Sequence, residues 1–182
     1  MAVSLYAISV GIYVPMLETL TAILDKGAEH AKANGKNPDA LLDAKLAGDM
    51  FPLSLQVRLC CHHAKDGVAR LTGATPPTIQ NMGGDVKTLA EMKAYVLVTI
   101  TQLRALTPQA FEGAESRKIA FAMQGPVHWE SDGVGFLRDW SLGHFYFHMV
   151  TAYDILRNQG VELGKRDYMA HVGGHIHPGA MD

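Results

Sequence analysis

Hydrophobic residues recur with the period of an α-helix in four long segments of this 182-residue chain. The first segment runs from Ser4, whose side chain can cap a helix, to about Ala33. Pro15 inside it predicts either a kink or a later start of the main helix. Gly35 and Asn37-Pro38 predict its end. Its apolar face is predicted to contain Val10, Leu17, Leu20, Leu24 and Ala28.

The second helical segment is predicted to begin around Asp49–Pro52, with Asp49 as its capping residue, and to continue to Leu71. A shorter helix, LLDAKLAG (residues 41–48), is predicted just before it. Gly73 and the following Pro76-Pro77 predict where the segment ends. Its inner face is predicted to contain Leu53, Val57, Cys60, Ala64, Val68 and Leu71.

The third segment has the clearest start, because Thr88 and Glu91 form the pattern of a capping box before an apolar run to Leu106. Residues 117–130 alternate in polarity and favour a short hairpin, with Gln124-Gly125-Pro126 at its turn.

The last helix is predicted to follow a loop at Ser131–Gly135 and to run to about Asn158, with Gly160 just beyond its end. Together the four segments predict an all-α fold, a four-helix bundle with a short β-hairpin or loop insertion before the last helix. We expect one domain over residues 1–170 and a flexible, His- and Gly-containing tail over residues 171–182.

Composition narrows the class of protein. The chain is 48% hydrophobic and carries a formal net charge of -2 without a basic stripe, so no nucleic-acid partner is expected. The two cysteines, Cys60 and Cys61, are adjacent and offer no disulfide framework. The N-terminal residues lack the pattern of a signal peptide, and no membrane span is expected. No phosphate-binding loop is present, so we expect no nucleotide cofactor. We also expect a cytoplasmic protein.

His144 and His148 are the candidate functional residues, because they lie one turn apart on the apolar face of the last helix. A buried imidazole without a partner costs roughly 1–3 kcal/mol, so each ring needs one. A divalent metal can be that partner, and hydrogen bonds to side chains or to the backbone are the alternative.

A third ligand has to come from another part of the chain. His62 is predicted to lie almost opposite the inner face of the second helix, toward solvent. His63 is predicted on the flank of that face, about a quarter turn away from its centre. Cys60 points inward, and water could also complete the site.

Other histidines are predicted to be peripheral. His128 lies in the hairpin, where it could line the mouth of a pocket. His171, His175 and His177 form a Gly-rich cluster of a kind that binds metal adventitiously, in a tail expected to extend into solvent.

Three blocks of sequence resemble an uncharacterised bacterial family of unknown function that is allied to the DinB/YfiT-like four-helix bundles. The blocks are LTAILDKGAEHA (Leu20–Ala31), DMFPLSLQV (Asp49–Val57) and HFYFHMVTAYDILRNQGVELGKRDYM (His144–Met169). The similarity extends over nearly the whole chain to about residue 169. It implies a bundle of the up-down-down-up type and, as is common for such bundles, a homodimer.

In the wider DinB-like group, one histidine from the second helix and an HxxxH pair on the last helix hold a metal. His144 and His148 match that pair, and His63 is the nearest match to the remaining ligand. The resemblance therefore implies a divalent metal (zinc, nickel or iron) on His144, His148 and His63, with Cys60 or water as alternatives to His63.

Activities in the wider group include thiol-dependent transferases and isomerases. The resemblance thus implies a metal-binding enzyme that acts on a small molecule or a cellular thiol. The alternative is a non-catalytic dimeric bundle with a ligand-binding or stress-related role.

Overall fold

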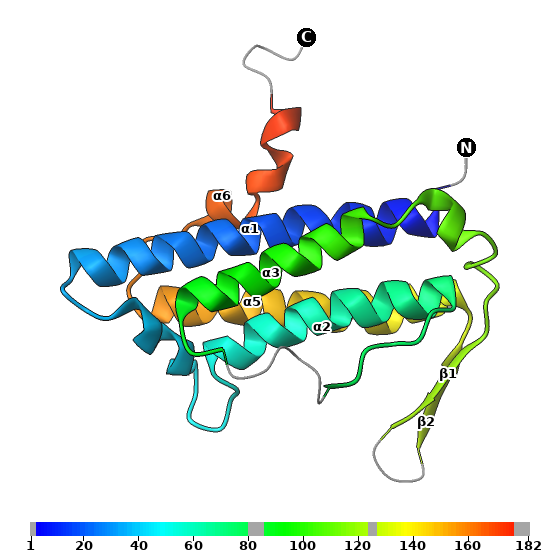
Figure 1. Ribbon diagram of the computed structural model, residues 1–182, viewed down its shortest axis with the longest axis horizontal. Helices are drawn as coiled ribbons and strands as arrows, with labels where there is room; N and C mark the ends of the chain where they lie inside the picture. Colours follow the sequence, from blue (N-terminus) through cyan, green and yellow to red (C-terminus); the bar gives the residue numbers. More distant parts are fainter. Residues whose placement is uncertain (1–2, 80–85, 124–126, 177–182) are drawn as a thin grey trace.

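A computed structural model describes residues 3–79, 86–123 and 127–176 of the chain, and four long helices dominate it (Figure 1). The helices are α1 (Leu5–Ala33), α2 (Leu53–Thr72), α3 (Leu89–Arg104) and α5 (Leu142–Asn158). α2 and α3 run parallel to each other and antiparallel to α1 and α5, which gives the up-down-down-up order (Figure 1). The predicted all-α bundle is confirmed.

The starts of α1 and α3 form where the sequence predicts them, whereas α3 ends at Arg104, two residues before the predicted Leu106. The Ser4 hydroxyl accepts a hydrogen bond from the Ala7 N–H at 3.2 Å and caps α1. α1 continues through Pro15 without interruption. The Thr88 hydroxyl accepts from the Glu91 N–H at 3.1 Å, while the Glu91 carboxylate accepts from the Thr88 N–H at 3.0 Å. This reciprocal pair is the predicted capping box, and it satisfies two N–H groups that a helix start otherwise leaves unpaired.

The start of α2 differs from the prediction. Its first residue is Leu53, Pro52 occupies the capping position without a side-chain hydrogen bond, and Asp49 lies outside the helix in a turn. The end is as predicted, because Gly73 adopts a left-handed conformation with a φ of 76° that favours glycine.

The short helix predicted over residues 41–48 is wrong as placed. A 3-10 helix, η1, forms instead at Pro38–Asp43, where the side chain of Asn37 accepts from the Asp39 N–H at 3.0 Å. Proline at the first position supplies the helical φ and lacks the N–H that would be unpaired there, which explains the earlier start.

A short 3-10 helix, η3 (Pro108–Phe111), and a two-stranded hairpin follow α3. Strands β1 (Ile119–Ala122) and β2 (His128–Ser131) pair antiparallel, with Phe121 opposite Trp129. The predicted hairpin is therefore present, and its proposed turn, Gln124-Gly125-Pro126, lies outside the described residues. The hairpin projects from the end of the bundle (Figure 1).

The last helical rod begins earlier than predicted and has an unusual start. A short turn, α4 (Gly133–Gly135), leads into a π-helical stretch, η4 (Phe136–Ser141), which continues directly into α5. The Asp132 carboxylate accepts from the Gly135 N–H at 2.7 Å and anchors this start. Gly160, with a φ of 87°, follows the end of α5 as predicted.

The chain after α5 contains α6 (Lys165–Tyr168) and a 3-10 helix, η5 (Ala170–His175). Both contact α1, and η5 then extends away from the bundle (Figure 1). His171 and His175 are exposed in η5, and His177 lies outside the described residues. The tail histidines described here thus lie apart from the bundle core.

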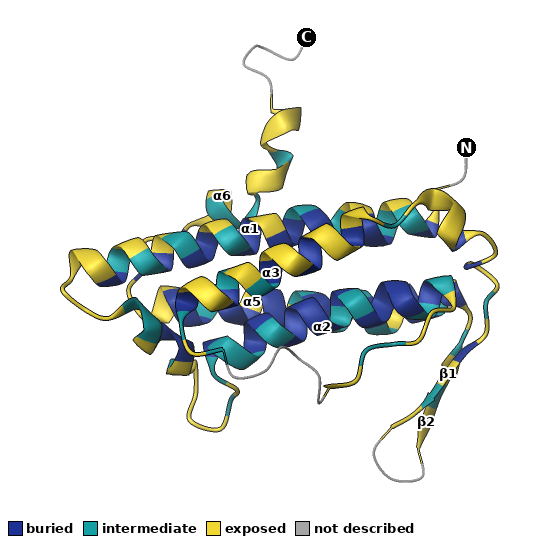
Figure 2. Ribbon diagram, in the orientation of Figure 1, coloured by how far each residue is buried: buried dark blue, intermediate teal, exposed yellow. Residues whose placement is uncertain are grey.

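Burial is unequal among the four long helices (Figure 2). α1 packs mainly on α3, and α2 packs mainly on α5. α2 is buried along almost its whole length, including the inner face that the sequence predicts, whereas α3 presents a broad exposed face. α1 is long and apolar enough to cross a membrane, yet 61% of its most apolar window is buried inside the bundle, as in the core helix of a soluble protein.

Candidate metal centre

α2 and the last helical rod approach each other closely at Gly67, and this contact sets the position of the candidate site. A Cβ atom on Gly67 would lie 2.4 Å from the Ser141 hydroxyl oxygen and 2.9 Å from the Tyr13 hydroxyl oxygen. The Tyr13 and Ser141 hydroxyls share a hydrogen bond of 2.8 Å. Ser141 ends the π-helical stretch and also donates to the His63 carbonyl oxygen at 3.5 Å. The backbone of α2 is thereby held against the first turn of α5.

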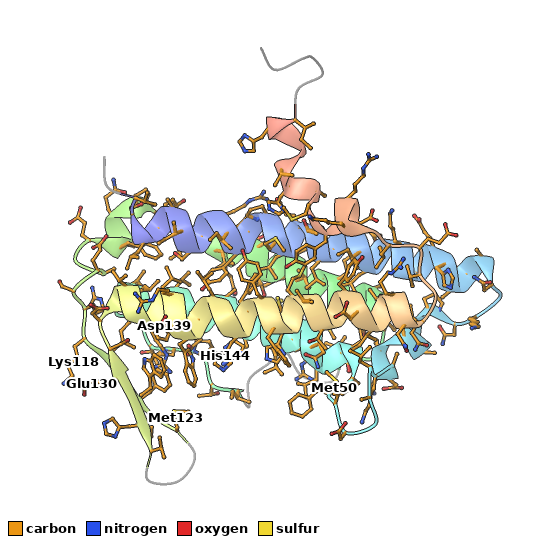
Figure 3. The ribbon with its side chains drawn as sticks, turned by 180° about the vertical axis from the view of Figure 1, so that it is seen from behind. Met50, Lys118, Met123, Glu130, Asp139 and His144 are labelled. Atoms are coloured by element: carbon orange, nitrogen blue, oxygen red, sulfur yellow. The ribbon has the colours of Figure 1, made fainter. Side chains whose placement is uncertain are left out.

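Three histidine rings meet just beyond this contact. The ring centroid of His63 lies 4.8 Å from that of His144 and 5.3 Å from that of His148. The flank position predicted for His63 thus places its ring beside both histidines of α5. The close packing at Gly67 brings the flank of α2 against α5, so the quarter turn predicted between His63 and the centre of the inner face does not separate the rings. His144 projects on the side of α5 that carries the hairpin (Figure 3).

Hydrogen bonds fix which ring nitrogen of His144 and His148 carries a proton. Nδ1 of His144 donates to the Trp140 carbonyl oxygen at 2.8 Å. Nδ1 of His148 donates to the side-chain oxygen of Gln56 at 2.7 Å, and the Gln56 amide group donates in turn to the Phe51 carbonyl oxygen at 3.2 Å. A carbonyl oxygen can only accept, so the proton of each neutral ring is on Nδ1. Nε2 of each ring is therefore left with a free lone pair.

Burial keeps the rings of His148 and His63 uncharged. Desolvation, together with the neighbouring His144 and His62, lowers the pKa of His148 to about 4. Desolvation lowers the pKa of His63 to about 3, with contributions from His144, His148 and His62. A charged imidazole cannot bind a metal, so His63 and His148 are in the protonation state that ligation requires at neutral pH.

The rings do not converge on a common point. His63 and His148 are stacked, with an angle of 6° between their planes. Within the described ranges, no group of three His, Cys, Asp or Glu side chains is arranged to hold a metal ion. The donor types fit a divalent metal, whereas ligation requires the His63 ring to turn out of its stack.

The two other candidates on α2 differ from expectation in different ways. Cys60 is fully buried, as predicted, and its thiol donates to the Phe145 carbonyl oxygen at 3.9 Å. Burial raises the pKa of Cys60 well above its usual range, so the thiol stays protonated and is a poor ligand. The expectation that His62 faces solvent is wrong, since only 5% of its surface is exposed. Its side of α2 is covered by the segment that follows the helix.

His62 and His63 border a cavity of about 610 Å³. Its walls come from α2, from the segment after α2, from the hairpin and from η4: Asp66, Arg70, Pro76, Pro77, Phe121 and Trp140. The cavity has a mostly apolar lining and reaches the three-histidine cluster at His63, so a ligand in it would lie next to His63.

An aromatic wall joins the hairpin to the histidines. The Trp140 ring centroid lies 4.3 Å from that of His144, 5.0 Å from Phe121 and 5.1 Å from Trp129. His128, the hairpin histidine singled out in the sequence, is exposed and does not line this cavity, whereas its neighbour Trp129 anchors the hairpin.

Sequence reasoning overlooked Gln56 and Arg70, and it assigns Asp66 to a solvated helix face although Asp66 is buried. Gln56 left a signal, because it is a polar residue two turns before His63 among the apolar positions of α2. Asp66 and Arg70 left the weaker signal of an ion pair four residues apart, which is usually a surface feature.

The bundle has a DinB-like fold. A crystal structure of a DinB family member protein from Shewanella denitrificans is similar over 98% of this chain and 96% of that one, with a TM-score of 0.81 and 34% sequence identity. Residues 5–169 match the family described as a domain of unknown function, DUF1993. The chain belongs to this family, which is allied to the DinB-like proteins. A comparison with curated proteins found no match.

Proposed function

We propose that this chain is a metal-binding member of the DinB-like bundles, in which His144, His148 and His63 hold one zinc, nickel or iron ion. The observation that carries the proposal is the shared tautomer of His144 and His148. Both rings commit Nδ1 to a carbonyl oxygen, and the nitrogen that remains is the one a metal would use. His63 supplies a third neutral ring at contact distance.

We further propose that the centre acts on a small molecule or a cellular thiol. A bound divalent ion supplies Lewis acidity, which lowers the pKa of a thiol or water attached to it. The residues of the chain orient the histidine rings and exclude water from the site. Gln56 and the Trp140 carbonyl fix the rings of His148 and His144, and the Trp140 ring shields one side of His144 from water.

The alternative function is that of a non-catalytic bundle, in which the histidines only form hydrogen bonds with other polar groups of the core. The stacking of His63 on His148 favours this reading, because stacked rings are stable without a metal. Every fully buried polar side-chain atom among the described residues also has a hydrogen-bond partner. The two functions make opposite predictions about metal content.

Metal analysis of protein purified without a nickel column tests the proposal. We expect about one zinc, nickel or iron per chain, lost in His148→Ala and in His144→Ala. Gln56→Leu should bind the metal about 10–100-fold more weakly, because the hydrogen bond that orients His148 is removed. The matched control replaces the tail histidines His171, His175 and His177 with alanine together, and it should keep the full metal content.

The result that overturns the metal centre is wild-type protein without metal whose folding is unchanged in His148→Ala. Loss of metal in the tail variant alone would also overturn it, because the binding would then be adventitious. The homodimer implied by the family resemblance and the cytoplasmic location stay predictions, and light scattering of the purified protein measures the first of them.

A further inference from the structure

Among the described residues that line the cavity beside the histidines, Arg70 is the one arginine or lysine. Its neighbours there are the carboxylate of Asp66, the rings of His62 and His63, and mostly apolar and aromatic side chains. The Arg70 side chain is 19% exposed, so it is held mostly out of bulk water. Its guanidinium carbon lies 4.1 Å from the ring centroid of Phe121, which fixes the plane of the group. The guanidinium group of Arg70 is therefore held in one orientation, with its N–H donors in a fixed planar arrangement.

Only one of the five N–H groups of Arg70 is used within the described residues. Nε donates to both carboxylate oxygens of Asp66 at 2.9 Å, and no hydrogen bond from the two Nη groups is found there. No polar side-chain atom is both fully buried and unpaired in these ranges, so the Nη groups are not fully buried, and Arg70 is one of the residues that line the cavity. Four N–H donors are left, and one on each Nη group can point in parallel at the two oxygens of a carboxylate.

The remaining walls suit an apolar body of limited size. Phe121 and Trp140 stand 5.0 Å apart, centroid to centroid, on one side. Ile79 and Met123, both partly exposed, form an apolar rim. A volume of about 610 Å³ is in the range of cavities that enclose small molecules, roughly 300–1,000 Å³.

We infer that this cavity binds a small aromatic carboxylate, whose carboxylate group pairs with the Nη groups of Arg70 and whose ring lies against Phe121 and Trp140. The other end of the ligand would face His63, which also borders the cavity. This inference names the substrate class of the proposed metal centre and rests on that function for the reaction, whereas the pairing with Arg70 needs no metal.

Calorimetric titration of the metal-free full chain tests the pairing with three probes: 3-phenylpropanoate, its neutral amide 3-phenylpropanamide, and propanoate. We expect the acid to bind about tenfold or more tightly than the amide, as a charge-assisted hydrogen-bonded pair predicts. We expect propanoate to bind about tenfold or more weakly than 3-phenylpropanoate, because it has no ring to bury.

Arg70→Gln should reduce the preference for acid over amide to about one. If this variant does not fold, Arg70→Lys keeps the charge without the planar fork and should lose most of the preference. The matched control is Arg138→Gln, which removes an arginine whose side chain is 71% exposed and paired with Asp139. It should leave the preference unchanged.

Three results overturn the inference: equal binding of acid and amide by the wild-type chain, a preference that survives both Arg70 variants, or equal binding of propanoate and 3-phenylpropanoate. His148→Ala separates this inference from the proposed function. We expect that variant to lose metal and keep the preference for the acid. If the preference appears only in the metal-loaded wild type and is absent from the metal-free chain and from His148→Ala, the carboxylate binds the metal, and the assignment to Arg70 falls while the metal centre stands.

Discussion

The two packed pairs of helices in this bundle keep their polar contacts at different depths. Between α1 and α3, the ion pairs Asp25–Lys93 and Glu18–Arg104 lie at the surface, with partly exposed side chains. Between α2 and α5, the polar contacts lie inside, where His148 and Gln56 are both buried and joined by a hydrogen bond of 2.7 Å.

This difference in the depth of polar contacts distinguishes the α1–α3 half, which is structural, from the α2–α5 half, which carries the candidate site. A surface pair exchanges its partner for water at little cost, so it constrains the fold weakly. A buried polar group that loses its partner costs roughly 1–3 kcal/mol, so an apolar residue would be the simpler choice in a purely structural core. The polar groups between α2 and α5 therefore support a chemical role for this half.

The strongest way to disturb the α2–α5 half is Gly67→Ala. The added Cβ would meet the Ser141 hydroxyl at 2.4 Å and the Tyr13 hydroxyl at 2.9 Å, so these side chains or η4 must move and their hydrogen bond is disturbed. We expect the free energy of unfolding to fall by about 2–3 kcal/mol, measured by urea denaturation. The control is Gly11→Ala in α1, where a Cβ meets nothing within 4 Å, and it should raise stability by roughly 0.5–1 kcal/mol. Equal effects of the two substitutions would contradict the close packing at Gly67.

The second largest expected effect is a dependence of the free energy of unfolding on pH. The pKa of His148 is about 4 in the folded chain, below the usual 6.5 of an unfolded histidine. Between pH 6.5 and about pH 4, His148 becomes protonated in the unfolded chain but stays neutral in the folded chain. The free energy of unfolding therefore falls as the pH falls through this window, and it is insensitive to this group above it.

Urea denaturation of the metal-free protein measures that dependence. Between pH 6.5 and pH 5, we expect His148 to contribute a loss of about 1–2 kcal/mol, which His148→Phe should remove. His128→Gln alters an exposed histidine of the hairpin and should preserve the wild-type dependence. The same loss of stability in wild type and His148→Phe would show that His148 accepts a proton normally in the folded chain.

The smallest effect belongs to the α1–α3 half. A double-mutant cycle with Lys93→Met and Asp25→Asn should give a coupling of about 0–1 kcal/mol, which decreases in high salt, because both side chains are partly exposed. Thermal or urea unfolding of the four proteins measures it. A coupling above roughly 2 kcal/mol would remove the contrast between the two halves.

Local signals explain which parts of the fold can be predicted from the sequence. The capping groups Ser4, Thr88 and Gly73 act within one helical turn, so their patterns identify helix ends directly. The periodicity of 3.6 residues likewise predicts the inner face of α2. Asp49 fails as a cap because α2 begins four residues later, at Leu53, which leaves Asp49 in a turn outside the helix.

Tertiary contacts explain the features of the site that sequence patterns do not predict. The exposure predicted for His62 assumes that solvent covers the side of α2 opposite the core, but the segment after α2 lies over it. The reach of His63 depends on Gly67, which lets η4 approach α2, and no periodicity reports that distance. The π-helical turn also changes the phase between Leu137 and His144, so a uniform 100° per residue does not describe this rod.

The up-down-down-up order has a consequence for how the chain is made. The contacts that build the candidate site join residues far apart in sequence: Gln56 to His148 across 92 residues, and Tyr13 to Ser141 across 128. Such distant contacts slow folding relative to a bundle of sequential neighbours. During synthesis, α1, α2 and α3 emerge before α5 exists. Until α5 docks, the part of α2 that packs on α5 has no partner, so the histidine cluster is completed last and a chain truncated before α5 exposes that part.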